Sequence, residues 1–480
     1  MLALITPDPP LSRAEQFGLD VLVDCSRLLR AGTEIRAAVE LHVVQSAAPM
    51  SLARGRARTW GIERQSGRID VPRALLQFVT DIAGGGVEQR STVMDRHNRV
   101  PASANPLVID GSEREPVVQH IARCLRDAVL AVRDRRPIRL VAPWPNRRRW
   151  AAALSHDIDV VALWPAFTGI RLLELARKRE LGRAVQVIAA ATRTVLGTPV
   201  LDGVRTVLAS EEAIAAPSTW FALCGTPTVS TFRAGDLTYR PESHAARHVL
   251  ELVLRAGHEV ELHGSFETFT NVSTFATQRE RLEKLTGRRV AGVRQHFLRM
   301  KPGHSQRAMA DAGFSFDSTF GFADRNGFRL GLADVVPAWS EVDSMSLPLD
   351  EVPFTWMDRA LSKYRGIEEP SAWTADAVAL AATCREVEGL WVGIWHPNLT
   401  PALGYPGAPA AYQELVQQLA ADEPWMATLS TVVAWRRARR GCRAVGVRPD
   451  GGVDYRTTTS NGFTVAFEEA DGTWTNDRLV

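Results

Sequence analysis

Residues 151–159 carry the sequence AAALSHDID, an apolar run that ends in a cluster of polar side chains. The run predicts a buried strand, and the segment over 170–196 that follows it has the pattern of a helix. Because side chains alternate along a strand, Asp157 and Asp159 should point to the same side. Two converging carboxylates repel each other unless a cation or a proton compensates them, which favours a metal ligand beside a base. The pattern is equally typical of a strand end whose aspartates cap a helix.

The alternation of strand and helix continues along the chain. Apolar runs predict strands at 218–223, 258–264, 290–296, 314–319 and 390–396, and helical patterns lie at 242–256, 277–285, 304–312 and 374–387. A strand that presents polar residues at its carboxyl end and is followed by a helix is typical of β/α barrels. We therefore predict an α/β protein whose barrel spans 146–440.

Three of the predicted strands carry a histidine at or next to their last residue. His263 is the penultimate residue of GHEVELHG (257–264), His296 follows Arg294-Gln, and His396 follows Gly-Ile-Trp395. An imidazole at a strand end can reach a metal ion, although a lone histidine there is more often a polar core or loop residue. Together with SHDID, four strand ends point to one site with metal and acid–base chemistry.

These segments resemble the motif series of the polysaccharide deacetylases, the NodB homology domain of carbohydrate esterase family four. SHDID resembles the first motif, GHEVELHG the second, the segment from Arg294 to His296 the third, and Ile-Trp-His396 the closing motif. The resemblance covers 150–401, and its wording is similar to a subgroup with an extended N-terminal region. It implies a distorted (β/α) barrel of the NodB type and a metal-dependent hydrolase that removes N-acetyl groups from amino sugars or glycans.

The resemblance also implies catalytic roles. Asp157 would be the general base, Arg294 would orient this carboxylate and keep it ionised, and His396 would protonate the leaving amine. Water would be the acyl acceptor, so no nucleophilic side chain is required.

A divalent ion, with Zn²⁺ expected, would be held by Asp159 and His263. The second metal histidine of the family would fall at Glu267 in this sequence. The third ligand is therefore either His296, which we favour, or Glu267.

The segment 317–329 lines up with one wall of the family's groove, and its polar and aromatic residues suit a sugar-binding surface. We predict Asp317, Phe322 and Arg325 as substrate-binding residues, together with Trp395 beside His396. A structural loop is the competing interpretation of this segment.

Two other functions stay open at this point. One is a hydrolase of the same fold that cleaves another non-peptide C–N bond, such as that of a small cyclic amide. The other is a catalytically silent glycan-binding protein, which the glutamate at 267 favours. The combination of Asp157, Asp159, Arg294 and His396 favours an enzyme, because binding alone needs no acid–base set.

The remaining segments carry no chemical motif. Residues 1–145 predict an N-terminal α/β accessory domain, with a helix over 113–133. Residues 441–480 predict a small β-rich tail, because Asp-Gly and Asn-Gly between alternating residues are hairpin signals.

Composition limits the partners and the compartment. The net charge is +3, from 57 basic and 54 acidic residues, so no overall field favours nucleic acid. Five cysteines lie far apart without a CxxC pair, which suggests neither a disulfide framework nor a cysteine zinc site. The N-terminus lacks the pattern of a secretory signal. No apolar run reaches the roughly 20 residues of a membrane span. We expect a cytoplasmic protein that acts on a lipid-linked or nucleotide-linked N-acetyl sugar. Peripheral membrane contact and the oligomeric state stay open.

Overall fold

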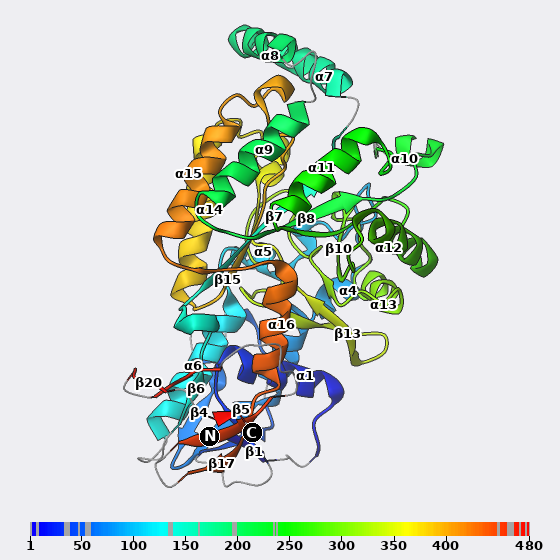
Figure 1. Ribbon diagram of the computed structural model, residues 1–480. Helices are drawn as coiled ribbons and strands as arrows, with labels where there is room; N and C mark the ends of the chain where they lie inside the picture. The colour runs from blue at the N-terminus through cyan, green and yellow to red at the C-terminus, as the bar shows by residue number, and fades with distance from the viewer. Residues whose placement is uncertain are drawn as a thin grey trace.

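The computed structural model describes two bodies of secondary structure, a large curled sheet wrapped by helices and a smaller sheet at the end where both chain termini lie (Figure 1). The described residues are 2–5, 9–32, 39–46, 49–52, 59–132, 138–161, 164–193, 199–233, 236, 239–448, 452–457, 465–469, 472–475 and 478–479. Among them, no helix combines the length and the hydropathy that crossing a membrane requires.

The large sheet is a half-barrel of mostly parallel strands. Its order is β12-β13-β11-β10-β9-β8-β7-β15-β14, and β16 also pairs with β7. The strands run as β7 (Ala151–Ile158), β8 (Ser218–Leu223), β9 (Glu259–Gly264), β10 (Gly292–Gln295), β11 (Phe316–Asp317), β12 (Val336–Ser340), β13 (Met345–Glu351), β14 (Trp356–Met357), β15 (Leu390–Ile394) and β16 (Trp425–Met426). The predicted α/β fold with a distorted barrel is confirmed. The sheet does not close, because β12 and β14 are its two edges.

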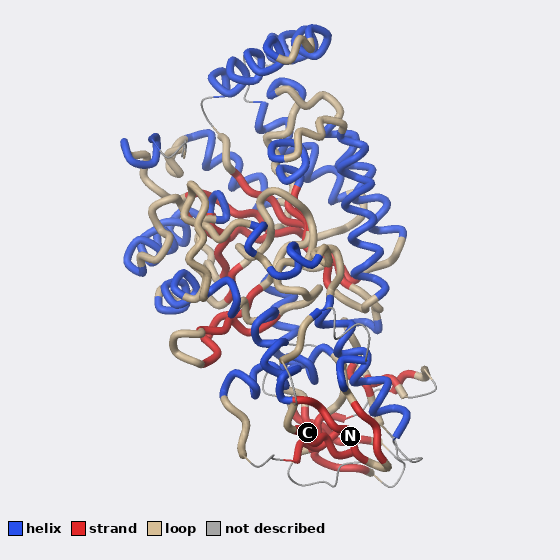
Figure 2. Tube along the Cα trace, turned by 180° about the vertical axis from the view of Figure 1, so that it is seen from behind, coloured by secondary structure: helices blue, strands red, loops and turns tan. Residues whose placement is uncertain are grey.

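Helices cover the outside of this sheet, as Figure 2 shows from behind. They are α9 (Pro199–Glu212), α10 (Val229–Arg233), α11 (His244–Arg255), α12 (Val272–Thr286), α13 (His304–Asp311), α14 (Pro370–Glu386), α15 (Ala408–Ala421) and α16 (Leu429–Arg440). Ser243 caps α11 and Asn271 caps α12, each by accepting a hydrogen bond from a backbone N–H of the first turn. The buried core between sheet and helices includes Trp220, Trp373 and Trp391.

In place of the single helix predicted over 170–196, the structure has a hairpin of two helices, α7 (Trp164–Arg177) and α8 (Leu181–Arg193); positions 194–196 of the prediction lie outside the described residues. The break falls at the charged residues 178–180, where Arg179 adopts a left-handed backbone with φ of 60°. A left-handed residue ends an α-helix, so the chain reverses direction here. The hairpin projects from the barrel at the end opposite to the chain termini (Figure 1).

The N- and C-terminal segments build the smaller sheet together. Its order is β21-β18-β17-β2-β1-β3-β5-β4, with β1 (Leu2–Ile5), β2 (Arg30–Ala31), β3 (Val39–Val44), β4 (Glu63–Gln65), β5 (Arg68–Pro72), β17 (Arg443–Val447), β18 (Val453–Arg456) and β21 (Arg478–Leu479). Helices α1 (Arg13–Cys25), α3 (Arg73–Ala83) and α6 (Val117–Val132) accompany it, with the short α4 (Gly86–Gln89) and α5 (Pro106–Asp110).

The predicted C-terminal hairpin is present as antiparallel β17 and β18, but it is not a free appendage. β17 pairs in parallel with β2 and so extends the N-terminal sheet. A third, three-stranded sheet joins β19 (Phe467–Glu468) to β20 (Trp474–Thr475) and to β6 (Leu140–Val141). The predicted boundaries at 145/146 and 440/441 stay an interpretation of the sequence.

Ion pairs connect the N-terminal segment to the barrel. Glu388, just before β15, accepts from Arg27 at 2.6 Å and from Arg126 at 2.8 Å. Burial alone would raise the pKa of Glu388, but the two guanidinium groups lower it to about 2. The ionised form is therefore the one that stabilises the fold.

We expect Glu388→Gln to lower the free energy of unfolding by about 3 kcal/mol at pH 7, because one pKa unit corresponds to about 1.4 kcal/mol and the pKa is lowered from 4.5 to about 2. This contribution is complete above pH 4.5 and is lost as the pH falls toward 2, so the difference between variant and wild type should shrink to about 1 kcal/mol at pH 3. Urea unfolding at both pH values measures it. A difference independent of pH would contradict the assignment.

Candidate metal and catalytic centre

The site lies at the carboxyl ends of the parallel strands. β9 and β10 pair with His263 opposite Arg294, and β7 lies next to β8 on one side and β15 on the other. Because parallel strands end at the same edge of a sheet, the residues that follow them meet there. Asp157 and Asp159 come from the end of β7, and His396 follows β15.

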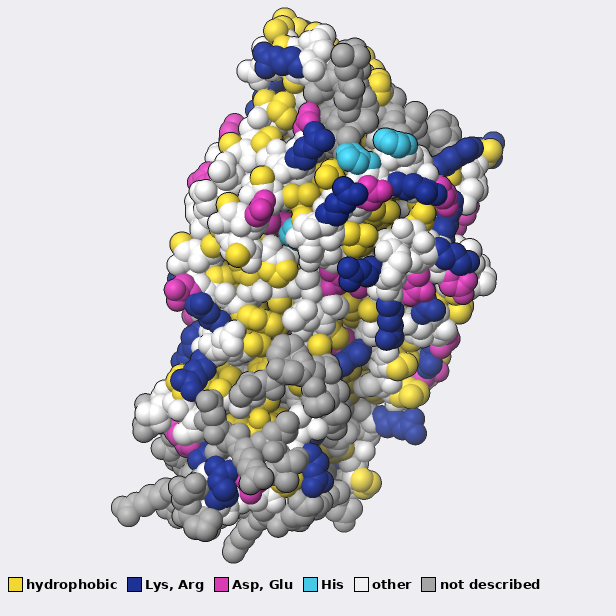
Figure 3. Space-filling model, in the orientation of Figure 1, with side chains coloured by type: hydrophobic (Ala, Val, Ile, Leu, Met, Phe, Trp, Pro, Cys, Tyr) yellow, Lys and Arg dark blue, Asp and Glu magenta, His cyan; other side chains and the backbone are white. Residues whose placement is uncertain are grey.

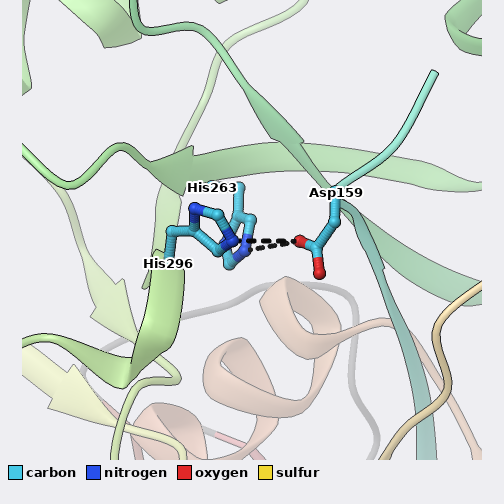
Figure 4. A group of neighbouring side chains, drawn as sticks. All are labelled: Asp159, His263 and His296. Carbon is cyan, nitrogen blue, oxygen red and sulfur yellow. Dashed lines mark ion pairs between the residues drawn. The ribbon is translucent and has the colours of Figure 1, made fainter. Parts of the chain in front are cut away.

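Asp159, His263 and His296 form a group with the geometry of a metal site. One ligand atom from each lies within 4.8 Å of the others. Asp159 Oδ1 is 3.2 Å from His263 Nε2 and 3.7 Å from His296 Nε2. Figure 4 shows both imidazoles directing a nitrogen at this carboxylate. The sequence prediction that favoured His296 names the same three residues.

The hydrogen bonds of the two imidazoles leave their Nε2 atoms available as ligands. His263 Nδ1–H donates to the backbone carbonyl of Arg294 at 2.9 Å, and His296 Nδ1–H donates to Asp236 Oδ1 at 2.9 Å. A partner on Nδ1 fixes the tautomer in which Nε2 carries a lone pair, which is the usual arrangement of a metal-binding histidine. Asp236 was not predicted from the sequence.

The Asp159 carboxylate completes a donor set that fits a divalent ion. Its Oδ1 is buried and has no hydrogen-bond partner among the described residues. Burial alone would raise the pKa of Asp159, yet His296, His263 and His396 hold it well below its ordinary value. Two imidazole nitrogens and one carboxylate oxygen are a donor set that could hold a divalent metal ion.

Asp157 is held by a fully buried arginine. Arg294 Nη1 donates to Asp157 Oδ1 at 2.7 Å, and its other nitrogens donate to the carbonyl and Oγ of Ser318 and to Ser155 Oγ. The guanidinium lies 4.1 Å from the ring centre of Phe221. Although burial opposes ionisation, Arg294 lowers the pKa of Asp157. Asp157 is thus an oriented, ionised carboxylate, as a general base must be.

His396 lies on the other side of Asp157 and Asp159. Its Nε2 is 3.9 Å from Asp157 Oδ2 and 3.6 Å from Asp159 Oδ2. Its Nδ1–H donates to Asp358 Oδ1 at 2.6 Å, and its backbone N–H donates to Asp358 Oδ2 at 2.6 Å. Burial would lower the pKa of His396, but Asp358 and the two other carboxylates raise it. A protonated imidazole at this point can act as an acid. Asp358 was also missed by the sequence analysis.

A cavity of about 560 Å³ opens above these groups. Asp157, Asp159, His263, His296 and His396 all contribute to its lining. The rest of the wall combines aromatic and basic side chains with residues of α7, and it includes Arg99, Phe167, Ile170, Arg171, Lys178, Phe297, Arg359, Lys363, Tyr364, Glu368 and Tyr405.

Glu267, the alternative third ligand, lies outside this group. Its side chain is exposed, and its Oε1 accepts from Thr228 Oγ1 at 2.9 Å. It belongs neither to the donor group nor to the lining of the cavity.

The four predicted substrate-binding residues also lie outside the lining. Asp317 is buried beside Glu351 and bonds to Thr319, and burial raises its pKa to about 6. Phe322 is buried, and Trp395 is buried against Trp356 with ring centres 6.0 Å apart. Arg325 is half-buried and pairs with Asp324 at 3.4 Å and Glu113 at 3.5 Å.

Comparison with known proteins gives matches among solved structures. No protein-family model matches the chain, and no curated protein matches it. A protein from Mycobacterium smegmatis assigned as a polysaccharide deacetylase is 23% identical over 64% of this chain and 96% of its own, with a TM-score of 0.42. The chitin deacetylase of Colletotrichum lindemuthianum is 11% identical over 64% of this chain and 92% of its own, with a TM-score of 0.32. A pseudoenzyme of carbohydrate esterase family four from Bacillus anthracis is 9% identical over 60% of this chain and 66% of its own, with a TM-score of 0.28.

We expect the purified protein, reconstituted with Zn²⁺ and dialysed, to retain about one ion per chain. His263→Ala and His296→Ala should each weaken binding by at least about tenfold, because each removes one of only three protein ligands. Glu267→Ala is the matched control and should bind as the wild type does. Metal content by plasma mass spectrometry gives the answer. Loss of metal in Glu267→Ala with retention in His296→Ala would reverse the choice of third ligand.

Proposed function

We propose that the chain is a metal-dependent hydrolase that removes the N-acetyl group of an amino sugar. One observation carries this proposal: the carboxylate of Asp157, held by Arg294, and the imidazole of His396, whose pKa is raised by Asp358, lie beside the three-residue metal group in the lining of one cavity. Amide hydrolysis needs a base for the attacking water and an acid for the departing nitrogen. The resemblance of the same segments to the polysaccharide deacetylase motifs supports the acetamide as the bond that is cleaved.

The residues would divide the chemistry as follows. A divalent ion held by Asp159, His263 and His296, with Zn²⁺ expected, would polarise the acetamide carbonyl and lower the pKa of water. Asp157 presents Oδ2 to the cavity while Arg294 binds Oδ1, so the free oxygen would take the proton of the attacking water.

His396 would complete the reaction as the acid. Its Nε2 faces the cavity, and Asp358 fixes the ring through Nδ1 and stabilises the imidazolium. Transfer of the Nε2 proton to the amide nitrogen would let the C–N bond break, giving acetate and a free amine. No side chain needs to carry the acyl group.

The geometry favours an enzyme over a silent glycan-binding protein. The glutamate at 267 was the feature that supported a silent protein, but three ligands are present without it. Sugar binding requires neither a buried carboxylate paired with arginine nor an imidazole charged by a carboxylate, and both carry a desolvation cost. A cyclic amide substrate stays the alternative within the enzyme class.

The cavity wall supports an anionic substrate. Arg359 contributes to the lining and donates to Tyr405 Oη at 3.0 Å, and Lys363 lies 5.9 Å from the ring centre of Phe297. Neither cation forms an ion pair with any acidic residue that the structure describes. A phosphate-linked N-acetyl sugar, as in a lipid-linked or nucleotide-linked glycan precursor in the cytoplasm, would place its negative charge beside these two cations.

Acetate release from a panel of N-acetyl sugars tests the activity. We expect Asp157→Asn and His396→Gln to lower kcat by about 10²- to 10⁴-fold while they keep the metal, because each removes a proton-transfer group but no ligand. The conservative variant Glu267→Gln serves as the control and should match the wild type. If the metal-loaded wild type releases no acetate but opens a small cyclic amide, the alternative hydrolase is correct.

A second comparison tests the charge of the substrate. We expect Lys363→Gln to raise KM for UDP-N-acetylglucosamine by about fivefold, as the loss of roughly 1 kcal/mol of charge-assisted binding predicts. The KM for an uncharged N-acetylglucosamine oligomer should not change. Lys284→Gln, an exposed lysine at the end of α12, is the matched control. An equal effect of Lys363→Gln on both substrates would contradict the anionic subsite.

A further inference from the structure

The hairpin of α7 and α8 exposes an unusual amount of apolar surface. Of the thirteen large hydrophobic side chains exposed in the described part of the chain, five lie between positions 170 and 188. Exposed clusters of this kind mark surfaces that bind something, whereas isolated exposed aliphatic residues need no explanation. The five are Ile170 (54% exposed), Leu173 (53%), Leu181 (69%), Val185 (65%) and Ile188 (50%).

The exposed residues of α8 form one stripe. Leu181, Val185 and Ile188 are spaced i, i+4 and i+7, which places them on one face of a helix. Val187, on the other side of α8, is buried, and so is Leu175 of α7. The hairpin thus packs through one apolar side and presents a second one to solvent.

Basic residues accompany the stripe. Over 164–193 the chain has six basic and two acidic side chains, a net charge of +4. Arg171, Lys178 and Arg183 bind Glu368 of the barrel. The remaining three, Arg177, Arg179 and Arg193, are exposed and form no ion pair with any residue that the structure describes. Figure 3 shows hydrophobic and basic side chains together at this end of the molecule.

We propose that the outer face of the α7–α8 hairpin binds the surface of a bilayer that contains anionic phospholipids. A helix with an aliphatic stripe beside unpaired arginines lies in the membrane interface, where the aliphatic groups enter the acyl boundary and the cations meet the headgroups. A second copy of this chain would instead bring like charges together. The positive charge of the hairpin therefore favours an anionic bilayer over a second copy of the chain as the binding partner.

The same hairpin connects the membrane to the site. Arg171 of α7, which is buried, and Ile170, one of the five exposed residues, both contribute to the lining of the cavity. A hairpin lying on the bilayer would hold the mouth of the cavity close to the headgroups. Membrane binding by the hairpin does not depend on the proposed hydrolase activity. The idea that the hairpin brings a lipid-linked sugar to the site does rest on the proposed function.

Vesicle co-sedimentation of the full chain tests the proposal. The wild type should bind vesicles of phosphatidylcholine and phosphatidylglycerol at 3:1, and bind pure phosphatidylcholine vesicles at least tenfold less tightly. The triple variant Leu181→Ser, Val185→Ser, Ile188→Ser and the triple variant Arg177→Ser, Arg179→Ser, Arg193→Ser should each lose at least tenfold in affinity for the anionic vesicles. None of these six side chains contributes to the cavity lining.

The matched control removes three equally exposed aliphatic side chains elsewhere. Ile109→Ser, Val342→Ser and Val447→Ser, at 73%, 75% and 50% exposure, should leave vesicle binding unchanged. Failure of the wild type to bind anionic vesicles, or equal loss in the control, overturns the proposal. So does a wild-type dimer that the α8 triple variant dissociates, since a second copy would then cover the stripe. Acetate release from a soluble N-acetyl sugar is measured separately for the wild type and the α8 variant. If the wild type releases no acetate, the proposed hydrolase activity is wrong, but the membrane-binding proposal is unaffected.

Discussion

The buried ion pair between Arg294 and Asp157 is the interaction on which the geometry of the site depends. The guanidinium of Arg294 contacts the end of β7 through Asp157 and Ser155, and contacts the residue after β11 through Ser318. The carbonyl of the same residue accepts the Nδ1 proton of His263. One residue of β10 therefore neutralises Asp157, connects its own strand to β7 and to the end of β11, and fixes the tautomer of His263. A buried charge of this kind is tolerated because each of the three guanidinium nitrogens donates at least one hydrogen bond.

The environment of each titratable group separates the roles that similar side chains play. Asp157 lies near the end of β7 and Asp159 directly follows the strand, but Asp157 pairs with an arginine whereas Asp159 Oδ1 lies close to two imidazoles. His296 and His396 each bind a carboxylate through Nδ1, yet only His296 belongs to the ligand group. In many active sites, neighbouring groups shift the pKa values of two titratable residues in opposite directions, so that one acts as an acid and the other as a base.

The sequence predicted the parts of the structure that are local. Alternation along 151–159 placed Asp157 and Asp159 on one side, and the apolar runs predicted the strands that bring His263, His296 and His396 together. Asp236 and Asp358 escaped prediction because each acts on a residue far along the chain, and β14 before Asp358 is only two residues long. The pairing of β17 with β2 is likewise long-range, since it joins Arg443 to Arg30. The substrate-binding role of 317–329 stays a prediction: Ala323 of this segment contributes to the cavity lining. Phe322 is instead buried, with its ring centre 5.7 Å from the guanidinium carbon of Arg329.

We infer that a single divalent ion binds between Asp159, His263 and His296. Diffraction from zinc-loaded crystals, recorded on both sides of the zinc absorption edge, locates the ion directly. We expect one anomalous peak about 2.0–2.2 Å from Asp159 Oδ1 and from Nε2 of both histidines. A fully loaded crystal whose only peak lies elsewhere, for example at Glu267, would contradict it.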